Sequence, residues 1–370
     1  MASIGAATGS AKFADPPLAL LEPSVLNDAC NIVLLVVDGL GYEYLAARPG
    51  SNMSSALLGT MTSVFPTTTA SAITTFLTGD APLQHGVPGW FTYFDELDNI
   101  YAVLPFQRRG SPDPDGPALS AAELLGHRSI FDRIPIDTYS VAPSSIADSE
   151  FNRTHSGSAD TRPYSTLSEF TREIELVVRE SKARKYIYAY WPEFDGLAHA
   201  RGIGSQDVTE HFEALDDAIG SLAKALTGTD TALLVTADHG FIDSLPEQRI
   251  EVQNHPEFAE LLRKPLCGEP RVAYCYVRDQ MHDAFRSYVE TEFAGKAECY
   301  ASRELLSAEL FGLGNAHPKL GQRLGDFTLI MQGDYHIKDT VPGERPFSMI
   351  GMHGGLTTQE LYVPLVLFNS

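Results

Sequence analysis

The sequence has little cysteine, no long apolar run and no start typical of a secreted protein. Its 370 residues include 4 cysteines, and no two of them form the close pair of a metal-binding or redox motif. This spacing indicates reduced thiols rather than a disulfide framework. No apolar segment approaches the roughly 18 residues of a membrane span. The N-terminal residues lack a basic start followed by an apolar stretch, so we expect no signal peptide, no membrane partner and a cytoplasmic location.

Positive charge is also scarce. The chain has 27 Lys and Arg against 48 Asp and Glu, which gives a net charge of −21. So acidic a surface repels the backbones of DNA and RNA, and we therefore expect no nucleic-acid polymer as a partner. If the substrate is a small molecule that carries phosphate, its charge must be compensated locally, and a bound metal ion would do this.

Four apolar runs rich in β-branched and aromatic residues predict strands that are buried on both faces of a parallel sheet. They are NIVLLVV (31–37), YIYAYW (186–191), ALLVTA (232–237) and LYVPLVLF (361–368). Pro364 in the last run favours an edge strand or a strand end. Apolar positions at helical spacing lie between the runs, at 167–177 and 208–226. The alternation predicts an α/β fold with a doubly wound, mostly parallel sheet flanked by helices.

Two stretches interrupt this pattern. Residues 86–135 are rich in aromatic residues, proline and glycine, and residues 251–340 contain a further strand–helix–strand pattern. We interpret the second stretch as a small α/β cap inserted into the main domain. The predicted division is a metal-binding catalytic domain of residues 1–250 and 341–370 with an inserted cap of residues 251–340.

Three of the predicted strands are followed by aspartate and histidine, residue types that commonly bind metals. Asp38 follows the first run, Asp195 follows the second with His199 four residues later, and Asp238 and His239 follow the third. In an open α/β sheet, ligands bind beyond the carboxyl ends of the strands. Carboxylates and imidazoles together suit zinc, manganese or iron. Each residue alone has a common structural role, such as a helix cap, but their joint occurrence indicates a metal centre, with His353 as a further candidate.

A hydroxyl-rich segment, SVFPTTTASAITTFLTG (63–79), offers a candidate nucleophile. Its small residues after Pro66 predict the start of a helix. In one interpretation a threonine merely caps this helix. In the other, a hydroxyl lies where free N–H groups and the helix dipole favour an alkoxide and an incoming phosphate. A threonine hydroxyl is a poor nucleophile near neutral pH, and coordination to a metal would activate it.

Five motifs together resemble the alkaline phosphatase superfamily, and within it the type I phosphodiesterase/nucleotide pyrophosphatase group. They are VVDGLG (36–41), FPTTTASAITTFLTG (65–79), Asp195-x-x-x-His199-x-x-Gly202, TADHG (236–240) and MHGGL (352–356). They occur in the order of that family and span nearly the whole chain. The resemblance implies a hydrolase of phosphodiester or phosphoanhydride bonds in a small, nucleotide-like substrate, acting through a covalent threonine phosphoryl-enzyme. The cysteine motif of sulfatases is absent.

The resemblance also implies two divalent metal ions, usually zinc. One would be held by Asp195, His199 and His353, and the other by Asp38, Asp238, His239 and the hydroxyl of Thr69. Thr69 is assigned as the nucleophile from the family's register relative to Thr78-Gly79, which places it three residues after Pro66. Thr67 and Thr68 are the nearest alternatives.

Two positions depart from the family pattern. Ala70 follows the nucleophile where relatives often carry an aromatic residue, and Trp90 stands where they carry an oxyanion-binding asparagine. Trp90 and Phe91 are candidates for substrate binding, and packing is an equally good interpretation of these aromatic residues. A phosphonate C–P hydrolase and a phosphomutase are alternative functions on the same metal core. A non-catalytic metal-binding module is a third alternative.

Overall fold

The apolar runs predicted from the sequence form four adjacent strands of one sheet. The structure is a computed structural model that describes residues 1–10, 13–110, 116–344 and 348–369. The four strands are β1 (Asn31–Val37), β8 (Lys185–Trp191), β9 (Thr231–Thr236) and β18 (Tyr362–Asn369).

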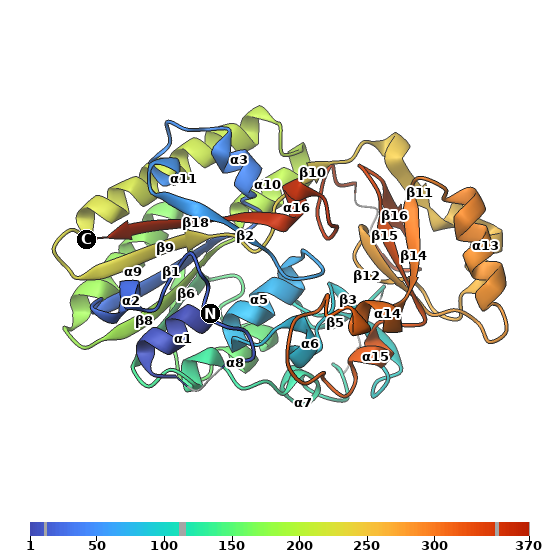
Figure 1. Cartoon of the computed structure of the whole chain (residues 1–370), viewed down its shortest axis with the longest axis horizontal. Helices are drawn as coiled ribbons and strands as arrows, with labels where there is room; N and C mark the ends of the chain where they lie inside the picture. The colour runs from blue at the N-terminus through green and yellow to red at the C-terminus, as the bar shows by residue number, and fades with distance from the viewer. Residues whose placement is uncertain (11–12, 111–115, 345–347, 370) are drawn as a thin grey trace.

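Three further strands complete this central sheet: β2 (Leu57–Thr62), β6 (Asp137–Pro143) and β7 (Asp160–Tyr164). The strand order is β2-β18-β9-β1-β8-β6-β7. β18 runs antiparallel to both of its neighbours, and the other neighbouring strands are parallel. The prediction of a doubly wound, mostly parallel sheet flanked by helices is confirmed (Figure 1).

The expectation that Pro364 marks an edge strand is wrong, and its alternative, a strand end, fits better, because Pro364 is the third residue of β18. β18 lies between β2 and β9, inside the sheet. The register of β18 against β2 shifts between Leu365 and Val366, and the pairing of β18 with β9 begins at Val366, two residues after Pro364. A proline has no N–H to donate, and such an irregularity in the ladder allows a sheet interior to accommodate it. The carbonyl of Pro364 still accepts a hydrogen bond, from Thr236 Oγ1 at 2.7 Å.

Alternate residues of β1 pack on opposite faces of the central sheet, and helices cover both faces. Val33 and Leu35 point to one face of the sheet. The helices that cover this face are α3 (Tyr42–Ala46), α4 (Asn52–Ser55), α9 (Leu167–Glu180), α10 (Glu193–Arg201) and α11 (Gln206–Ala225). Ile32 and Leu34 point to the opposite face. The helices that cover it are α1 (Ala2–Thr8), α2 (Ser24–Asn27), α5 (Thr69–Thr78), α7 (Ala121–Leu125) and α8 (Glu150–His155). The strands are therefore buried on both sides, as their unbroken apolar runs predict.

A second sheet, entirely antiparallel, forms the other lobe of the molecule (Figure 1). In spatial order its strands are β14 (Ala297–Ala301), β15 (Phe327–Met331), β13 (Val272–Cys275), β12 (Cys267–Gly268), β3 (Phe91–Phe94), β4 (Asn99–Ala102) and β5 (Gln107–Arg108). Phe91 pairs with Gly268, and this pairing joins the two stretches that interrupt the pattern of the main domain. The second sheet thus includes residues 91–108, which the predicted division assigned to the catalytic domain.

Short elements cover the second sheet and connect the lobes. α12 (Pro256–Leu261) and α13 (His282–Glu292) pack on one face of the sheet, and α14 (Ser302–Ser307) and α15 (Leu320–Arg323) pack on the other. Two further strand pairs are β10 (Ile242–Asp243) with β17 (Gly351–Met352) and β11 (Arg249–Glu251) with β16 (His336–Lys338). Ile250 of β11 and Ile337 of β16 pack in the core of the second lobe. The other short helices are α6 (Pro82–His85), α16 (Thr358–Leu361), η1 (Ile130–Asp132), η2 (Pro246–Gln248) and η3 (Val252–Asn254). Within the described ranges, no helix combines the length and the apolar character needed to cross a bilayer.

One buried ion pair ties the second lobe to the central sheet. Arg271 precedes β13, and its Nη2 and Nε lie 2.9 and 3.1 Å from the two carboxylate oxygens of Glu360 in α16. Both side chains are fully buried. Glu360 also accepts hydrogen bonds from Gly355 N at 2.8 Å and from Thr357 Oγ1 at 2.7 Å. The pair therefore fixes the turn that follows His353.

We expect Arg271→Ala to lower the melting temperature strongly. The substitution leaves the Glu360 carboxylate buried without its cation, and the loss of one partner of a buried pair costs about 3–5 kcal/mol. The matched control is Arg179→Ala, which breaks the exposed pair of Arg179 with Glu175 at 2.8 Å and should cost less than about 1 kcal/mol. Thermal unfolding followed by circular dichroism measures both, and equal melting temperatures for the two variants would contradict the role assigned to Arg271.

Candidate metal centre and active site

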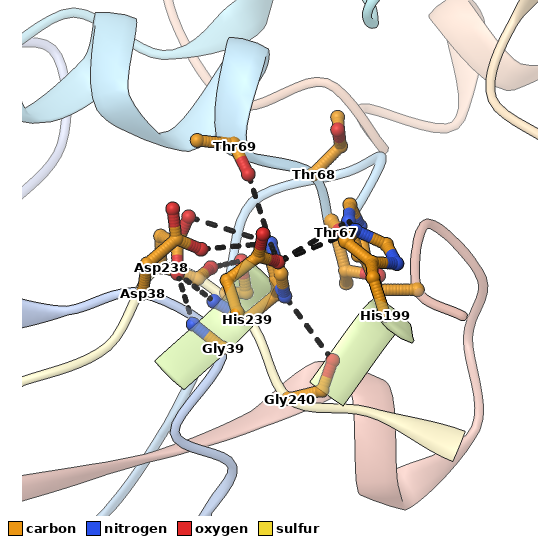
Figure 2. Close-up of polar contacts among 12 residues, drawn as sticks. Asp38, Gly39, Thr67, Thr68, Thr69, His199, Asp238, His239 and Gly240 are labelled. Atoms are coloured by element: carbon orange, nitrogen blue, oxygen red, sulfur yellow. Dashed lines mark hydrogen bonds and ion pairs between the residues drawn. The ribbon is translucent and has the colours of Figure 1, made fainter. Parts of the chain in front are cut away.

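The carboxyl ends of three neighbouring strands bring the predicted ligands together (Figure 2). Asp38 follows β1, Asp238 and His239 follow β9, Asp195 and His199 lie one turn apart on α10 after β8, and His353 follows β17. His239 Nε2 lies 3.4 Å from Asp38 Oδ1 and 3.4 Å from Asp238 Oδ2. The rings of His239 and His353 stack with their centroids 3.7 Å apart. The structure therefore places all the predicted carboxylate and imidazole ligands in one cluster.

Backbone groups orient Asp238 within the cluster. Its Oδ1 accepts hydrogen bonds from the backbone N–H groups of Gly39 and His239, both at 2.9 Å. Gly39 has φ +78°, and a Cβ at this position would lie 2.4 Å from the ring of Phe241. Glycine is therefore required for the turn that presents its N–H to the carboxylate. Because Oδ1 is engaged, Oδ2 is the oxygen that faces His239.

The three histidines share one orientation. Their Nδ1 atoms lie near backbone carbonyls: His199 at 2.8 Å from Gly351, His239 at 3.2 Å from Gly240, and His353 at 3.1 Å from Thr67. A carbonyl oxygen only accepts, so Nδ1 carries the proton and Nε2 presents a lone pair to the cluster. The Nε2 atoms of His199 and His353 are 3.2 Å apart, so two lone pairs face each other. Metal-binding histidines are typically held in this way, with the outer nitrogen on a carbonyl.

Three carboxylate oxygens of the cluster also lack a partner. Asp38 Oδ1, Asp195 Oδ1 and Asp238 Oδ2 are buried and make no hydrogen bond within the part of the chain that the structure describes. Burial, followed by the negative charges of Asp195 and Asp238, raises the pKa of Asp38 well above its ordinary value. Burial likewise raises the pKa of Asp195. Unpaired buried oxygens beside imidazole lone pairs fit a divalent cation, which would compensate their charge.

Two overlapping sets of these residues are close enough to hold a metal ion each. Asp38, Asp238 and His239 form one set, Asp195, His239 and His353 form the other, and the ligand atoms within each set lie within 4.8 Å of one another. His199 adjoins the second set, with its Nε2 3.4 Å from Asp195 Oδ1. The family resemblance implies His239 as a ligand of the first ion alone. In the structure His239 Nε2 lies between the two sets, 4.0 Å from Asp195 Oδ1.

Thr69 is the first residue of α5, and its hydroxyl points into the cluster. Thr69 Oγ1 lies 3.1 Å from His239 Nε2 (Figure 2). Thr68 occupies the N-cap position of α5, but its side chain makes no capping hydrogen bond. The interpretation of the hydroxyl-rich segment as a side-chain cap is therefore wrong. The uncapped first turn leaves N–H groups that an anion can bind.

The two alternative threonines have other partners. Thr67 Oγ1 donates a hydrogen bond to the carbonyl of Gly355 at 2.8 Å, and Thr68 Oγ1 donates to Glu269 Oε1 at 2.5 Å. Figure 2 shows the side chain of Thr68 on the side of the segment away from Asp38. The geometry therefore favours Thr69 over both neighbours as the hydroxyl of the site.

A cavity of about 520 Å³ opens beside Thr69. Trp90 and Phe91, the predicted substrate-binding residues, line it together with apolar side chains that include Met352. The guanidinium of Arg109 lies 4.2 Å from the centroid of the Phe91 ring. The structure thus brings the aromatic pair and the candidate nucleophile to one cavity, between the two lobes.

Glu269 and His336 are among the polar residues of the cavity wall that were not predicted as site residues. Glu269 follows β12, and His336 begins β16. His336 Nδ1 lies 2.7 Å from Ser244 Oγ, and burial, helped by the positive charge of Arg249, lowers the pKa of His336 to about 4. Neither residue belongs to a local motif. Both reach the cavity through pairings between segments far apart in the chain, which no sequence spacing indicates.

Comparisons with known proteins identify the family and the fold of the chain. The profile of the type I phosphodiesterase / nucleotide pyrophosphatase family matches residues 32–356. Murine ectonucleotide pyrophosphatase / phosphodiesterase 5 superposes with a TM-score of 0.68 at 17% identity, over 90% of this chain and 87% of that chain. Phosphonoacetate hydrolase from Sinorhizobium meliloti 1021 superposes with a TM-score of 0.66 at 16% identity, over 91% and 89%. The murine protein is also known as an inactive threonine-to-alanine variant in complex with AMP. A search of curated protein sequences gives no significant match.

We expect the zinc-loaded protein to bind two equivalents of metal, one for each set of ligands. Asp238→Asn keeps an acceptor for the N–H groups of Gly39 and His239 but removes the anionic Oδ2, so it should lose zinc from one site while the protein stays folded. Elemental analysis after gel filtration, together with the melting temperature, measures this. His282→Ala, on the exposed side of α13, is the control and should keep both equivalents. A content of one equivalent or less in the wild type would contradict a two-metal centre.

Proposed function

Because the chain belongs to the type I phosphodiesterase / nucleotide pyrophosphatase family, whose members are hydrolases, we propose that it hydrolyses a phosphodiester or phosphoanhydride bond in a small, nucleotide-like molecule. Thr69 is the proposed nucleophile. The observation that carries this proposal is the position of Thr69 Oγ1, at the start of α5, 3.1 Å from His239 Nε2 and in the wall of the cavity. The inactive threonine-to-alanine variant of the murine relative supports a threonine nucleophile in this fold.

The proposed ligands are those that converge on the cluster. Asp38, Asp238, His239 and the Thr69 hydroxyl would hold one cation, and Asp195, His199 and His353 would hold the other. Zinc is the proposed ion, and the same donors suit manganese or iron. When bound, these cations lower the pKa of the threonine hydroxyl and compensate the charge of the phosphoryl oxygens.

The chain's own groups perform the two halves of the reaction. Thr69 Oγ1 attacks phosphorus, and the bond from phosphorus to the leaving oxygen breaks as the bond to Oγ1 forms. The uncapped N–H groups at the start of α5 bind a non-bridging oxygen of the group in transfer. Water then hydrolyses the phosphoryl ester of Thr69 and restores the hydroxyl. Trp90 and Phe91 supply an aromatic wall for the leaving group.

A phosphonate is the second candidate substrate, because phosphonoacetate hydrolase shares this fold. A phosphonate with a carboxylate in its leaving group requires a free cation in the cavity wall. The guanidinium of Arg109 is already held by Glu344 at 2.7 Å and by the carbonyl of Leu266 at 2.6 Å. Arg249 and Lys338 also line the cavity, so a carboxylate-bearing phosphonate stays the second candidate beside the ester. Phosphate release from phosphonoacetate, measured beside ester hydrolysis, separates the two.

We expect Thr69→Ala to abolish turnover without unfolding the protein. Loss of an activated nucleophile removes the covalent path and should lower kcat by about 10³-fold or more, whereas Thr69→Ser keeps a hydroxyl and should retain partial activity. Hydrolysis of p-nitrophenyl thymidine monophosphate measures turnover, and the melting temperature should stay within a few degrees of the wild type.

Thr74→Ala is the matched control for this substitution. Thr74 lies in the same helix, and its hydroxyl donates only to the carbonyl of Ala70, so the variant should remain active. If Thr69→Ala retains more than about a tenth of the wild-type kcat, the assignment of the nucleophile fails. If Thr68→Ala is the inactive variant instead, the nucleophile is the neighbouring threonine.

Phosphodiesters should be better substrates than phosphomonoesters. A monoester carries an additional negative charge, and the groups nearest Thr69 are carboxylates and imidazoles. Arg201, the one cation within the five motifs, is exposed and pairs with Asp207 at 3.1 Å, away from the cavity. We expect kcat/KM for bis-p-nitrophenyl phosphate to exceed that for p-nitrophenyl phosphate by about tenfold or more, which corresponds to roughly 1.4 kcal/mol of transition-state stabilisation. An equal or higher value for the monoester would show the reverse preference.

A further inference from the structure

Glu269 is a buried acid in the wall of the active-site cavity, and the mechanism above gives it no part. It lies in the second lobe, directly after β12, and lines the same cavity as Thr69. Its exposed fraction is 8%. The backbones at Gly89 and Gly268 approach each other closely, because a Cβ on Gly89 would lie 2.9 Å from the Cα of Gly268. This close approach places Glu269, the next residue, in the cavity wall. The second lobe thus inserts a carboxyl group beside the nucleophile.

One oxygen of Glu269 is fully engaged, and the other is left for a ligand. Oε1 accepts a hydrogen bond from Thr68 Oγ1 at 2.5 Å and another from Trp90 N at 2.6 Å. Oε2 makes no hydrogen bond with any residue in the ranges that the structure describes. The carboxyl group is therefore held in one orientation by the residue before Thr69 and by the aromatic wall. Such preorganisation is what a group needs to act on a transition state without first reorienting.

Charge decides which form of this carboxyl group can face an anionic substrate. An ionised carboxylate beside a phosphodiester would repel it, whereas a protonated carboxyl donates a hydrogen bond to it. Burial raises the pKa of Glu269 to about 7, and the negative charge of Asp195 acts in the same direction, against the two hydrogen bonds at Oε1. Arg271, two residues along the chain, is committed to Glu360 and does not neutralise Glu269.

We propose that Glu269 is a catalytic residue that donates a hydrogen bond from Oε2 to a non-bridging oxygen of the phosphorus group while Thr69 attacks. This proposal rests on the proposed function. No covalent bond to Glu269 forms or breaks, and its proton stays on Oε2 throughout. The hydrogen bond strengthens as negative charge collects on that oxygen, so it stabilises the transition state more than the bound substrate.

Glu269→Gln and Glu269→Met form a matched pair that tests the donor. Both side chains are close to glutamate in size. Glutamine keeps an acceptor for Thr68 and Trp90 and offers an N–H donor in place of Oε2, whereas methionine has no donor. We expect Glu269→Gln to keep kcat within about tenfold of the wild type and Glu269→Met to lose about 10²–10³-fold, the cost of one oxyanion donor. Melting temperatures establish that each variant is folded, and Glu269→Ala replaces the methionine variant if that one does not fold.

Sulfur substitution supplies a readout that a merely structural role would not change. The two diastereomers of p-nitrophenyl thymidine phosphorothioate place sulfur, a poor acceptor, at one or the other non-bridging position. The ratio of their kcat/KM values should shift by about tenfold or more in Glu269→Met, because the lost hydrogen bond matters for one diastereomer only. The ratio should stay at the wild-type value in Glu269→Gln.

The outcomes separate this proposal from the proposed function. If Glu269→Met hydrolyses the esters as fast as the wild type, or is slower with an unchanged diastereomer ratio, Glu269 is no donor to the phosphorus group. In that case Thr69 keeps its role as long as Thr69→Ala is inactive in the same assay. A wild-type protein that hydrolyses neither diastereomer nor the parent ester would overturn the proposed function and the role of Glu269 with it.

Discussion

Repulsion among three carboxylates, two of them buried and one partly buried, is the constraint on which the site depends. Asp38, Asp195 and Asp238 meet because the strands before them run parallel and end at the same edge of the sheet. The protein compensates part of their charge with the hydroxyl of Tyr190 and the N–H of Gly39. The oxygens that are left face the Nε2 atoms of the histidines, so the remaining compensation falls to cations. The net charge of −21 repels an anionic substrate at a distance. Cations bound in this cluster would attract the substrate to the site.

The sequence predicts four of the seven strands of the central sheet, β1, β8, β9 and β18, because their apolar runs are local signals, whereas β2, β6 and β7 were not predicted. The run at 31–37 coincides with β1, and the acids that follow such runs have to meet once the strands are parallel. Glu269 could not be predicted in the same way, since its partners are Thr68 and Trp90, far away in the chain. The strand–helix–strand pattern within residues 251–340 appears in the structure as β13, α13 and β15, but its union with residues 91–108 through the pairing of Phe91 with Gly268 was not predicted, for the same reason. Register between distant segments depends on tertiary packing, which no local pattern records.

The segment around β12 and β13 connects the two lobes functionally as well as physically. Glu269 accepts a hydrogen bond from Thr68, and Arg271 forms an ion pair with Glu360. Two residues of the turn between β12 and β13 thus contact both sides of the cavity. The aromatic wall at Trp90 and Phe91 belongs to the same sheet. None of these residues is a candidate metal ligand. On the proposed function, we expect substitutions in the second sheet to change the leaving-group preference while they leave the cluster at the ends of β1, β8 and β9 unchanged.

The place of β18 inside the central sheet has a consequence for biosynthesis. β2 pairs with β18 at Thr62 and Tyr362, and β18 is the last strand in chain order. On the ribosome, β2 is therefore made early and waits for its neighbour until the rest of the sheet has been synthesised. During that time the edge of β9 is open as well, because β18 also pairs with β9. Open strand edges are templates for association with other chains, so the nascent protein is most exposed to aggregation just before this strand is added.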